Sequence, residues 1–566
     1  MVASLYLLMT VSISVMPIAA QGDNISDEAY AQYELGVAQY WDGSNDELAV
    51  EYLTQALELA PNFADAYAYR GAAYRLVADF ASAESDFAQA LAIDPDNALA
   101  YAWRGRLMFD YQQYQAALTD IDHAIQLNPE LIEGYFLRGY LHLQLGNPFA
   151  AMEDINHCIE LDPEFIRSYL VRAQIYAYQL QYEEAYSEIA AVLEQDPGSF
   201  MARWLRSNLR SNTGDYMGAI EDLEYMVEHY PENAIAYKSL AETYSRIGQF
   251  DLAEDLLHQA EAIEGMTAEL YLSWGYFYGF KGDYIDPAYH VDAINMYKQA
   301  IAMLPPGQVN AEIYMSVAYD YDRLGQVDDA IDAYTQALYL RPAFHEAALN
   351  RGRLYFRSRQ YEDALADFNL AIEIWPEFAL AYYYRGLTYR YLRQYDLAIA
   401  DLDRCIELNP GYGSAYLERA RLLYRQYDSS DKMKQAIEDD YNAALQFGAD
   451  PAQVYSQRAE FYYLTRRHDE ALEQNNLALE LDPENVDYWT QRINLLTNMR
   501  RYEEAYAAAT DFIELDPNDA TRYGFRLWLY DFAEELNQPP YVDTLRSDCD
   551  RVAEFGDDPF PICENN

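Results

Sequence analysis

An arginine and an acidic residue recur together along the chain, each at a fixed place in a repeated pattern. In the stretch AYYYRG, Arg385 directly precedes Gly386, and Asp401 is the matching acid. A guanidinium can donate two parallel hydrogen bonds to one carboxylate, which explains why arginine, never lysine, occupies the first place. The pairs are Arg70 and Asp86, Arg104 and Asp120, Arg138 and Asp154, Arg172 and Glu188, Arg206 and Asp222, Arg351 and Asp367, Arg385 and Asp401, and Arg419 and Asp440.

Two interpretations of these pairs are open: a row of cations that binds a ligand, or ion pairs that hold two segments of the chain together. Four repeats lack both the arginine and the acid, so the two residue types appear and disappear together. Arg458 and Arg492 are exceptions, since Gln474 and Ala508 stand where their acids are expected. We interpret the pairs as structural, and breaking one would cost about 3–5 kcal/mol if it is buried.

The segments that carry these residues follow a 34-residue period. In most repeats a small residue stands ten residues after a recurring proline, and an alanine stands twelve residues before it. Between these marks the apolar residues step by three and four, which is the period of an α-helix. Each repeat predicts two helices joined by a short turn, with a proline after the second helix. These prolines are Pro61, Pro95, Pro129, Pro163, Pro197, Pro231, Pro342, Pro376, Pro410, Pro483 and Pro517.

This pattern resembles the tetratricopeptide repeat (TPR) family over nearly the whole chain, in about 14 repeats from Ala29 to about Asp519. The resemblance implies an all-α fold, a right-handed superhelical solenoid of stacked antiparallel helix hairpins whose first helices line a concave groove. The period itself requires only that each helical hairpin buries its apolar face against its neighbours.

Breaks in the repeat suggest the domain organisation. An apolar run that ends in small residues is typical of a secretory signal, and a polar stretch follows it directly. An insertion interrupts the repeat near the middle of the chain. The predicted parts are a signal peptide (1–20), a short acidic lead (21–28), a front array of about 7 repeats (29–267), an irregular repeat with an insertion (268–309), a back array of about 6 repeats (310–519), and C-terminal capping helices with a disulfide-closed tail (520–566).

The four cysteines fall into two groups. Cys158 and Cys405 occupy the alanine position of a second helix, so we expect buried, free thiols. Cys549 and Cys563 lie beyond the last repeat, and in an exported chain their proximity predicts a disulfide that holds the tail in place. The predicted location is therefore outside the cytoplasm: extracellular, at the cell surface or in the periplasm.

Composition and motifs argue against several functions. A net charge of -54 leaves no excess of cations for nucleic acid. No nucleophile elbow, catalytic triad order or glycine-rich phosphate loop appears, so we expect neither an enzyme nor a cofactor. Beyond residue 20 no apolar run is long enough to span a membrane, so we expect no membrane insertion after signal cleavage. Asp320, Asp322, Asp328 and Asp329 form an acid-rich turn that could take Ca²⁺, without EF-hand spacing.

The resemblance places a candidate ligand-binding surface on the first helices of three consecutive repeats. The lysine-plus-asparagine clamp of some family members is not met, because Glu242 stands where the asparagine should follow Lys238. Arginines and aromatic residues alternate instead, which predicts either a charge-balanced solvated face or a docking surface for an acidic segment. These residues are Arg353, Phe356, Arg357, Tyr383, Arg390, Tyr391, Arg421, Tyr424 and Arg425.

Two functional hypotheses follow, both for a non-catalytic scaffold with a protein partner. The leading one is self-association into an extracellular or cell-surface assembly, with a head-to-tail fibre as one form. It depends on the first helix, where Tyr30, Tyr33, Leu35, Tyr40 and Trp41 lack a clear capping repeat. The alternative is a monomeric periplasmic or extracellular adaptor that binds an acidic peptide segment in its concave groove.

Overall fold

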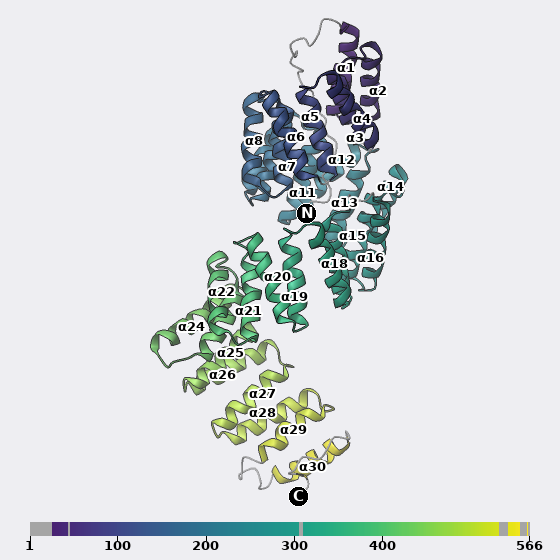
Figure 1. Ribbon diagram of the computed structural model, residues 1–566. Coiled ribbons are helices and arrows are strands. Elements are labelled where there is room, and N and C mark those ends of the chain that lie inside the picture. Colours follow the sequence, from purple (N-terminus) through teal and green to yellow (C-terminus); the bar gives the residue numbers. More distant parts are fainter. Residues whose placement is uncertain are drawn as a thin grey trace. The chain divides into compact units, whose positions relative to one another are not determined.

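The computed structural model in Figure 1 describes residues 25–42, 46–77, 79–111, 113–304, 309–530, 541–554 and 563. These residues form thirty α-helices, and no strand occurs among them. The predicted signal peptide 1–20 and residues 21–24 of the acidic lead lie outside the described residues. None of the described helices is long and apolar enough to cross a membrane.

The helices pair in chain order into hairpins, and the chain divides into two compact units, residues 1–342 and 343–566. Unit 1 contains α1 (Asp27–Asp42), α2 (Asp46–Leu59), α3 (Ala64–Leu76), α4 (Phe80–Ile93), α5 (Ala98–Asp110), α6 (Tyr114–Leu127), α7 (Ile132–Gln144), α8 (Pro148–Leu161), α9 (Ile166–Tyr178), α10 (Tyr182–Gln195), α11 (Phe200–Thr213), α12 (Tyr216–His229), α13 (Ala234–Arg246), α14 (Phe250–Glu264), α15 (Ala268–Tyr284), α16 (Tyr289–Met303), α17 (Ala311–Arg323) and α18 (Val327–Leu340). Unit 2 contains α19 (His345–Arg357), α20 (Tyr361–Ile374), α21 (Ala379–Tyr391), α22 (Tyr395–Leu408), α23 (Gly413–Arg425), α24 (Asp431–Gln446), α25 (Pro451–Leu464), α26 (His468–Leu481), α27 (Val486–Asn498), α28 (Tyr502–Leu515), α29 (Ala520–Tyr530) and α30 (Tyr541–Glu554). This arrangement is an all-α solenoid of stacked helix hairpins, as the repeat pattern predicts.

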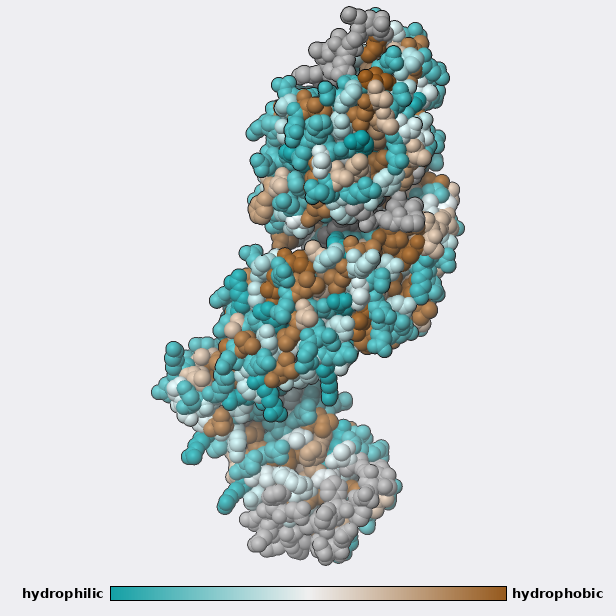
Figure 2. All heavy atoms as spheres, viewed as in Figure 1, coloured by the Kyte–Doolittle hydropathy of each residue, from teal (hydrophilic) through white to brown (hydrophobic). Residues whose placement is uncertain are grey.

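The small residues of the repeat allow the two helices of a hairpin to approach closely. A Cβ atom on Gly71 in α3 would lie 2.7 Å from the ring of Phe87 in α4, so a larger residue would displace this ring. In the hairpin of α21 and α22, a Cβ atom on Gly386 would lie 3.2 Å from the carbonyl oxygen of Ala398. Apolar side chains fill these interfaces, whereas hydrophilic side chains cover much of the visible surface (Figure 2).

The irregular repeat near the middle of the chain packs around a buried histidine. Its first helix, α15, has 17 residues, and His290 at the start of α16 is completely buried. The Nδ1 atom of His290 lies 2.7 Å from Oδ1 of Asp320 in α17, and burial raises the pKa of Asp320 to about 6. A Cβ atom on Gly282 would lie 2.8 Å from the histidine ring, so only glycine leaves room for this side chain.

The four acids that were considered for Ca²⁺ do not form a single turn. Asp320 and Asp322 lie within α17, and Asp328 and Asp329 lie in the first turn of α18. Asp320 is only 2% exposed and directs its carboxylate at His290. Among the described residues there is no cluster of three or more side chains suited to a metal ion.

The helices predicted as a C-terminal cap form a further hairpin of the repeat. Arg526 in α29 and Asp548 in α30 pair through two contacts, at 2.8 and 2.6 Å. Arg526 lies nine residues after Pro517, just as Arg70 follows Pro61. The sequence analysis missed this repeat because the connection between α29 and α30 is longer than a standard turn, which displaces the acid from its expected position.

The cysteines adopt two states in the structure. Cys549 and Cys563 form a disulfide that closes a loop with a sequence separation of 14, and they contact the apolar core of the last hairpins. Cys158 and Cys405 are buried and free, and desolvation raises the pKa of each thiol to about 12. These two thiols are therefore small core residues rather than reactive groups.

Replacing both tail cysteines, Cys549→Ser with Cys563→Ser, should destabilise the last hairpin by about 3 kcal/mol in the chain-entropy estimate for a short closed loop. Hydrogen exchange of the amides in α29 and α30 measures this loss. Reductant should cause the same loss in the unmodified chain and no further loss in the variant. Two free tail thiols in non-reducing peptide mapping would contradict the assignment.

Candidate functional site

All eight predicted ion pairs lie within hydrogen-bonding distance. Arg385 shows the geometry: Nε lies 2.8 Å from Oδ2 of Asp401, and Nη2 lies 2.7 Å from Oδ1. The arginine thus reaches from the first helix to the second helix of its own hairpin. The shortest contacts are 2.7 Å in Arg70–Asp86, Arg104–Asp120, Arg138–Asp154 and Arg385–Asp401, 2.8 Å in Arg172–Glu188, 2.6 Å in Arg351–Asp367 and Arg419–Asp440, and 2.5 Å in Arg206–Asp222.

A third contact of the same guanidinium was not predicted. Nη1 of Arg385 donates to Oδ1 of Asn369 at 2.7 Å, and Asn369 belongs to the second helix of the preceding hairpin. The arginine therefore joins two hairpins as well as two helices. The sequence does carry a signal for this contact: the acceptor stands two positions after the acid position of the preceding hairpin, as Asn369 follows Asp367. Further contacts of this kind are Arg70–Thr54, Arg138–Asp122, Arg172–Asn156, Arg419–Asp403 and Arg526–Thr510.

A tyrosine one helical turn before the arginine packs its ring against the guanidinium group. The guanidinium of Arg385 lies 5.3 Å from the ring centroid of Tyr382, within the range of a cation–π contact. The hydroxyl of Tyr382 donates to the carbonyl of Pro376, the proline that ends the preceding repeat. The same stacking holds for Arg70 on Tyr67, Arg104 on Tyr101, Arg138 on Tyr135, Arg172 on Tyr169 and Arg419 on Tyr416.

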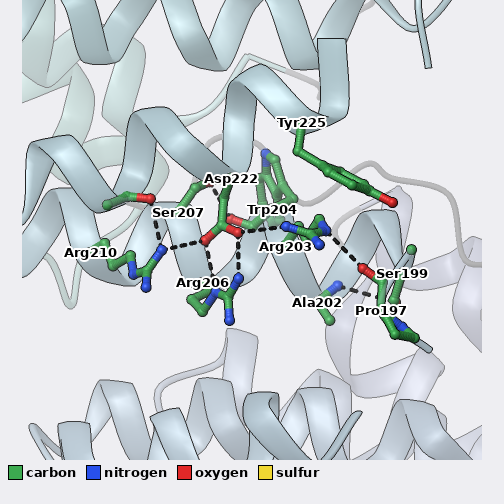
Figure 3. Close-up of polar contacts among 12 residues, drawn as sticks. Pro197, Ser199, Ala202, Arg203, Trp204, Arg206, Ser207, Arg210, Asp222 and Tyr225 are labelled. Carbon is green, nitrogen blue, oxygen red and sulfur yellow. Dashed lines mark hydrogen bonds and ion pairs between the residues drawn. The ribbon is translucent and has the colours of Figure 1, made fainter. Parts of the chain in front are cut away.

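Burial and charge strengthen these pairs. The side chains of Arg385 and Asp401 are only 19% and 9% exposed. Hydrogen bonding to Asp401 raises the pKa of Arg385 above its usual value, so this guanidinium stays charged. One acid can also hold several cations: Asp222 accepts hydrogen bonds from Arg206, Arg203 and Arg210 (Figure 3).

The two late arginines without the expected acid find other partners. Arg458 donates to Glu438 at 2.9 Å, and Glu438 lies in α24, the second helix of the preceding hairpin. Arg492 donates to Asn476 alone among the described carboxylates and amides, and desolvation lowers its pKa. The first pairing was missed because Glu438 lies two positions before Asp440, the acid of the preceding hairpin, and so stands outside the positions that the repeat pattern marks.

The concave face of the first hairpins in unit 1 is filled by their own side chains. The indole nitrogen of Trp41 donates to the hydroxyl of Tyr69, which in turn donates to Glu133 at 2.8 Å. Arg167 in α9 donates to the carbonyl of Trp41 at 2.5 Å across 126 residues of sequence. Tyr33 and Trp103 pack in the same aromatic cluster. These contacts join the first helices α1, α3, α5, α7 and α9 directly, so this part of the face offers no open groove.

The predicted groove residues lie on first helices of unit 2. Helices α19, α21 and α23 together contain eight arginines and only two glutamates, whereas their partner helices carry most of the acids. Three of these arginines are used in the hairpin pairs. The remaining five are the groove arginines Arg353, Arg357, Arg390, Arg421 and Arg425.

Glu418 partly neutralises this surface. Nε of Arg390 lies 3.2 Å from Oε2 of Glu418, and Nη1 of Arg421 lies 3.4 Å from its Oε1. Arg353 is exposed and lies over the ring of Tyr384. Glu418 was not among the predicted site residues, although a single acid on an otherwise basic helix face is visible in the sequence.

The aromatic groove residues form contacts among themselves. Phe356 and Tyr391 pack edge to face on neighbouring first helices at 5.3 Å. Tyr383 is half-buried against Tyr412, and desolvation raises its pKa well above the usual value. Tyr424 packs edge to face against Phe461 of the next first helix. The rings thus link successive hairpins and leave part of their surface beside the arginines.

Comparisons with known proteins agree with the repeat pattern. Five segments match models described as tetratricopeptide repeat, at residues 30–62, 105–176, 213–272, 317–377 and 379–412. Among the solved structures that match is the crystal structure of the APC/C hetero-tetramer Cut9–Hcn1, with a TM-score of 0.40 and 14% identity over 83% of this chain and 96% of that chain. No curated protein sequence is significantly similar to this chain.

The substitution Asp401→Ala should leave Arg385 charged and largely buried without its main partner, because the guanidinium cannot lose its proton. We expect a loss of roughly 3 kcal/mol in the stability of α21 and α22, measured by hydrogen exchange. The control Glu407→Ala removes an exposed acid of α22 and should change stability little. The double variant Arg385→Leu with Asp401→Ala should recover most of the loss; an equal loss in the control would contradict the ion-pair explanation.

Proposed function

The chain belongs to the tetratricopeptide repeat family and is a protein-interaction scaffold, and we propose that it binds an acidic segment of a partner protein along the first helices of unit 2. The observation that carries this proposal is the excess of eight arginines over two glutamates on α19, α21 and α23, in a chain of net charge -54. A local cationic surface in such a chain attracts acidic ligands selectively.

The arrangement of arginines and rings suits an extended peptide. Arg353 and Arg425 are exposed and can turn toward a carboxylate, whereas Arg390 already contacts Glu418. Guanidinium groups bind carboxylates through two parallel hydrogen bonds, and the exposed parts of Tyr383 and Tyr424 can contact the peptide between its charges. The first helices of three consecutive repeats thus offer separate contacts to successive residues of one segment.

The end-to-end assembly considered as the leading hypothesis has less support than this surface. Tyr33, Tyr40 and Trp41 are each less than a tenth exposed, because they pack against side chains of α3, α5 and α9. Of the five residues that motivated the hypothesis, Leu35 alone is exposed to a large extent, at 48%. At the other end, Leu545 and Val552 in α30 pack in the same core as Leu527 in α29. The scaffold is therefore proposed as an adaptor rather than as a fibre.

We propose further that the scaffold works outside the cytoplasm. The Cys549–Cys563 disulfide supports this location, because such bonds persist in oxidising compartments and are rare where thiols are kept reduced. The apolar N-terminal segment also supports it. The test is to express the full-length chain in a secreting host and determine the first residue of the exported product.

The triple variant Arg353→Ser, Arg421→Ser and Arg425→Ser should weaken binding of a short polyglutamate peptide by about tenfold or more, since each charge-assisted contact contributes about 1 kcal/mol or more. Arg390 stays in place because this variant already removes Arg421, so losing Arg390 as well would leave Glu418 without either of its two arginines. Fluorescence anisotropy measures the affinity, and circular dichroism should show unchanged helicity and melting.

The matched control is Arg404→Ser, Lys432→Ser and Lys434→Ser, which removes the same number of positive charges from the second helices α22 and α24. This variant should bind the peptide as tightly as the unmodified chain. If both variants weaken binding equally, only the overall charge matters and the groove assignment is wrong.

A further inference from the structure

Four arginines of unit 2 occupy a turn position where four described hairpins of unit 1 have glycine. Each lies between the first and the second helix of a hairpin, in the left-handed backbone region. We call these residues, Arg359, Arg393, Arg466 and Arg500, the arginine edge; their φ angles are 62°, 61°, 60° and 60°. Among the described residues of unit 1, the equivalent ones in this backbone region are Gly146, Gly214, Gly248 and Gly325, together with Leu180.

The backbone gives no reason for arginine at this position. The left-handed region costs an L-residue roughly 1–2 kcal/mol, and glycine avoids this cost. The helix dipoles give no net reason either. The position follows the C-terminus of one helix, where a cation is favoured, and precedes the N-terminus of the next, where it is disfavoured. Four repeats of unit 2 therefore accept a strained residue that the fold does not require.

The side chains of the arginine edge are available to a ligand. All four are exposed, and none forms an ion pair with a described residue, although the chain contains 93 acids. Their neighbours differ: Arg467 pairs with Glu438 and Glu470, and Arg501 pairs with Glu504. In each of these two turns, therefore, one arginine forms ion pairs within the fold, and the arginine directly before it forms none with a described residue.

We propose that the arginine edge binds an extended acidic polysaccharide that runs along the turns of unit 2. Equivalent positions in stacked hairpins follow one edge of a solenoid, so the four guanidinium groups lie along this edge as two pairs. The α23–α24 hairpin separates the pairs, and its left-handed turn residue is Ser429. A long polymer can contact all of them at once, and its affinity rises with each simultaneous contact. Guanidinium groups match the carboxylates of such a polymer.

Charge also favours a thin polymer over a second acidic protein. Unit 2 carries 23 Lys or Arg residues against 41 Asp or Glu residues, so it repels large anions overall. The screening length at physiological salt is about 8 Å. A single polysaccharide chain on the edge therefore interacts electrostatically mainly with the arginines within this distance. A second copy of this chain would bring its own acids close to those of unit 2.

The experiment measures binding of polygalacturonate to the purified full chain at low salt, with uncharged dextran as the negative control. The quadruple variant Arg359→Gly, Arg393→Gly, Arg466→Gly and Arg500→Gly should lose about tenfold or more in affinity, because binding to a polyanion depends on the number of cations engaged. The same variant should melt at the same temperature or higher, since glycine relieves the left-handed strain.

A matched comparison separates position from net charge. Arg359→Gly with Arg393→Gly should weaken polygalacturonate binding, whereas Arg404→Ser with Lys432→Ser, which lowers the charge equally, should not. Absence of binding by the unmodified chain, or equal losses in both double variants, would overturn the proposal. Loss of polyglutamate binding instead of polygalacturonate binding in the quadruple variant would assign the edge to an acidic protein.

The proposals for the groove and for the arginine edge can be tested separately. The groove variant of Arg353, Arg421 and Arg425 should lose polyglutamate and keep polygalacturonate, and the edge variant should do the reverse. If polygalacturonate is lost only in the groove variant, the polysaccharide lies in the groove and the arginine edge has no such role.

Discussion

The ion pair between the arginine of one helix and the acid of the next is the contact on which the repeated architecture depends. A single guanidinium engages a carboxylate of its own hairpin, an acceptor on the preceding hairpin and a tyrosine ring, as Arg385 does with Asp401, Asn369 and Tyr382. A leucine at this position could fill the same space, but it could not specify which helix lies on either side. The arginine fixes the pairing of helices and the stacking of hairpins with the same set of directional bonds.

The two units use their remaining cations differently. In unit 1 they are drawn into the concave face, where Arg75 pairs with the buried Asp110 and Arg167 lies against Trp41. In this face the charged side chains contact other residues of the same unit. In unit 2 several arginines remain on the first helices and at the turns, where the fold does not need them. The surface proposed for recognition therefore lies in unit 2.

Much of the fold could be predicted because its signals are periodic and local. The 34-residue spacing of prolines, the small residue opposite Phe87 and the joint presence of Arg385 and Asp401 all depend on residues less than one repeat apart. Contacts that cross repeats were missed, such as Arg167 with Trp41, because a superhelix brings distant residues together without any sequence mark. The long connection between α29 and α30 hid the pairing of Arg526 with Asp548 by changing the spacing on which the prediction relied. The pairing of Arg458 with Glu438 was missed because Glu438 lies two positions before the acid position. The acid-rich turn was mispredicted for another reason. Asp320 belongs to a helix, and its carboxylate contacts the buried side chain of His290.

The range of the arginine contacts also bears on how such an array can change in length. The partners of Arg385 on either side, Asp401 and Asn369, are each 16 residues away, which is less than half of the 34-residue period. If an ancestral gene duplicated or deleted one period in frame, each arginine would again meet an acid ahead of it and an amide, hydroxyl or carboxylate behind it. Copy number can therefore drift without leaving an unpaired charge at the junction. The same rule lets a recombinant array be shortened by whole periods, whereas a cut within a period would separate an arginine from its acid.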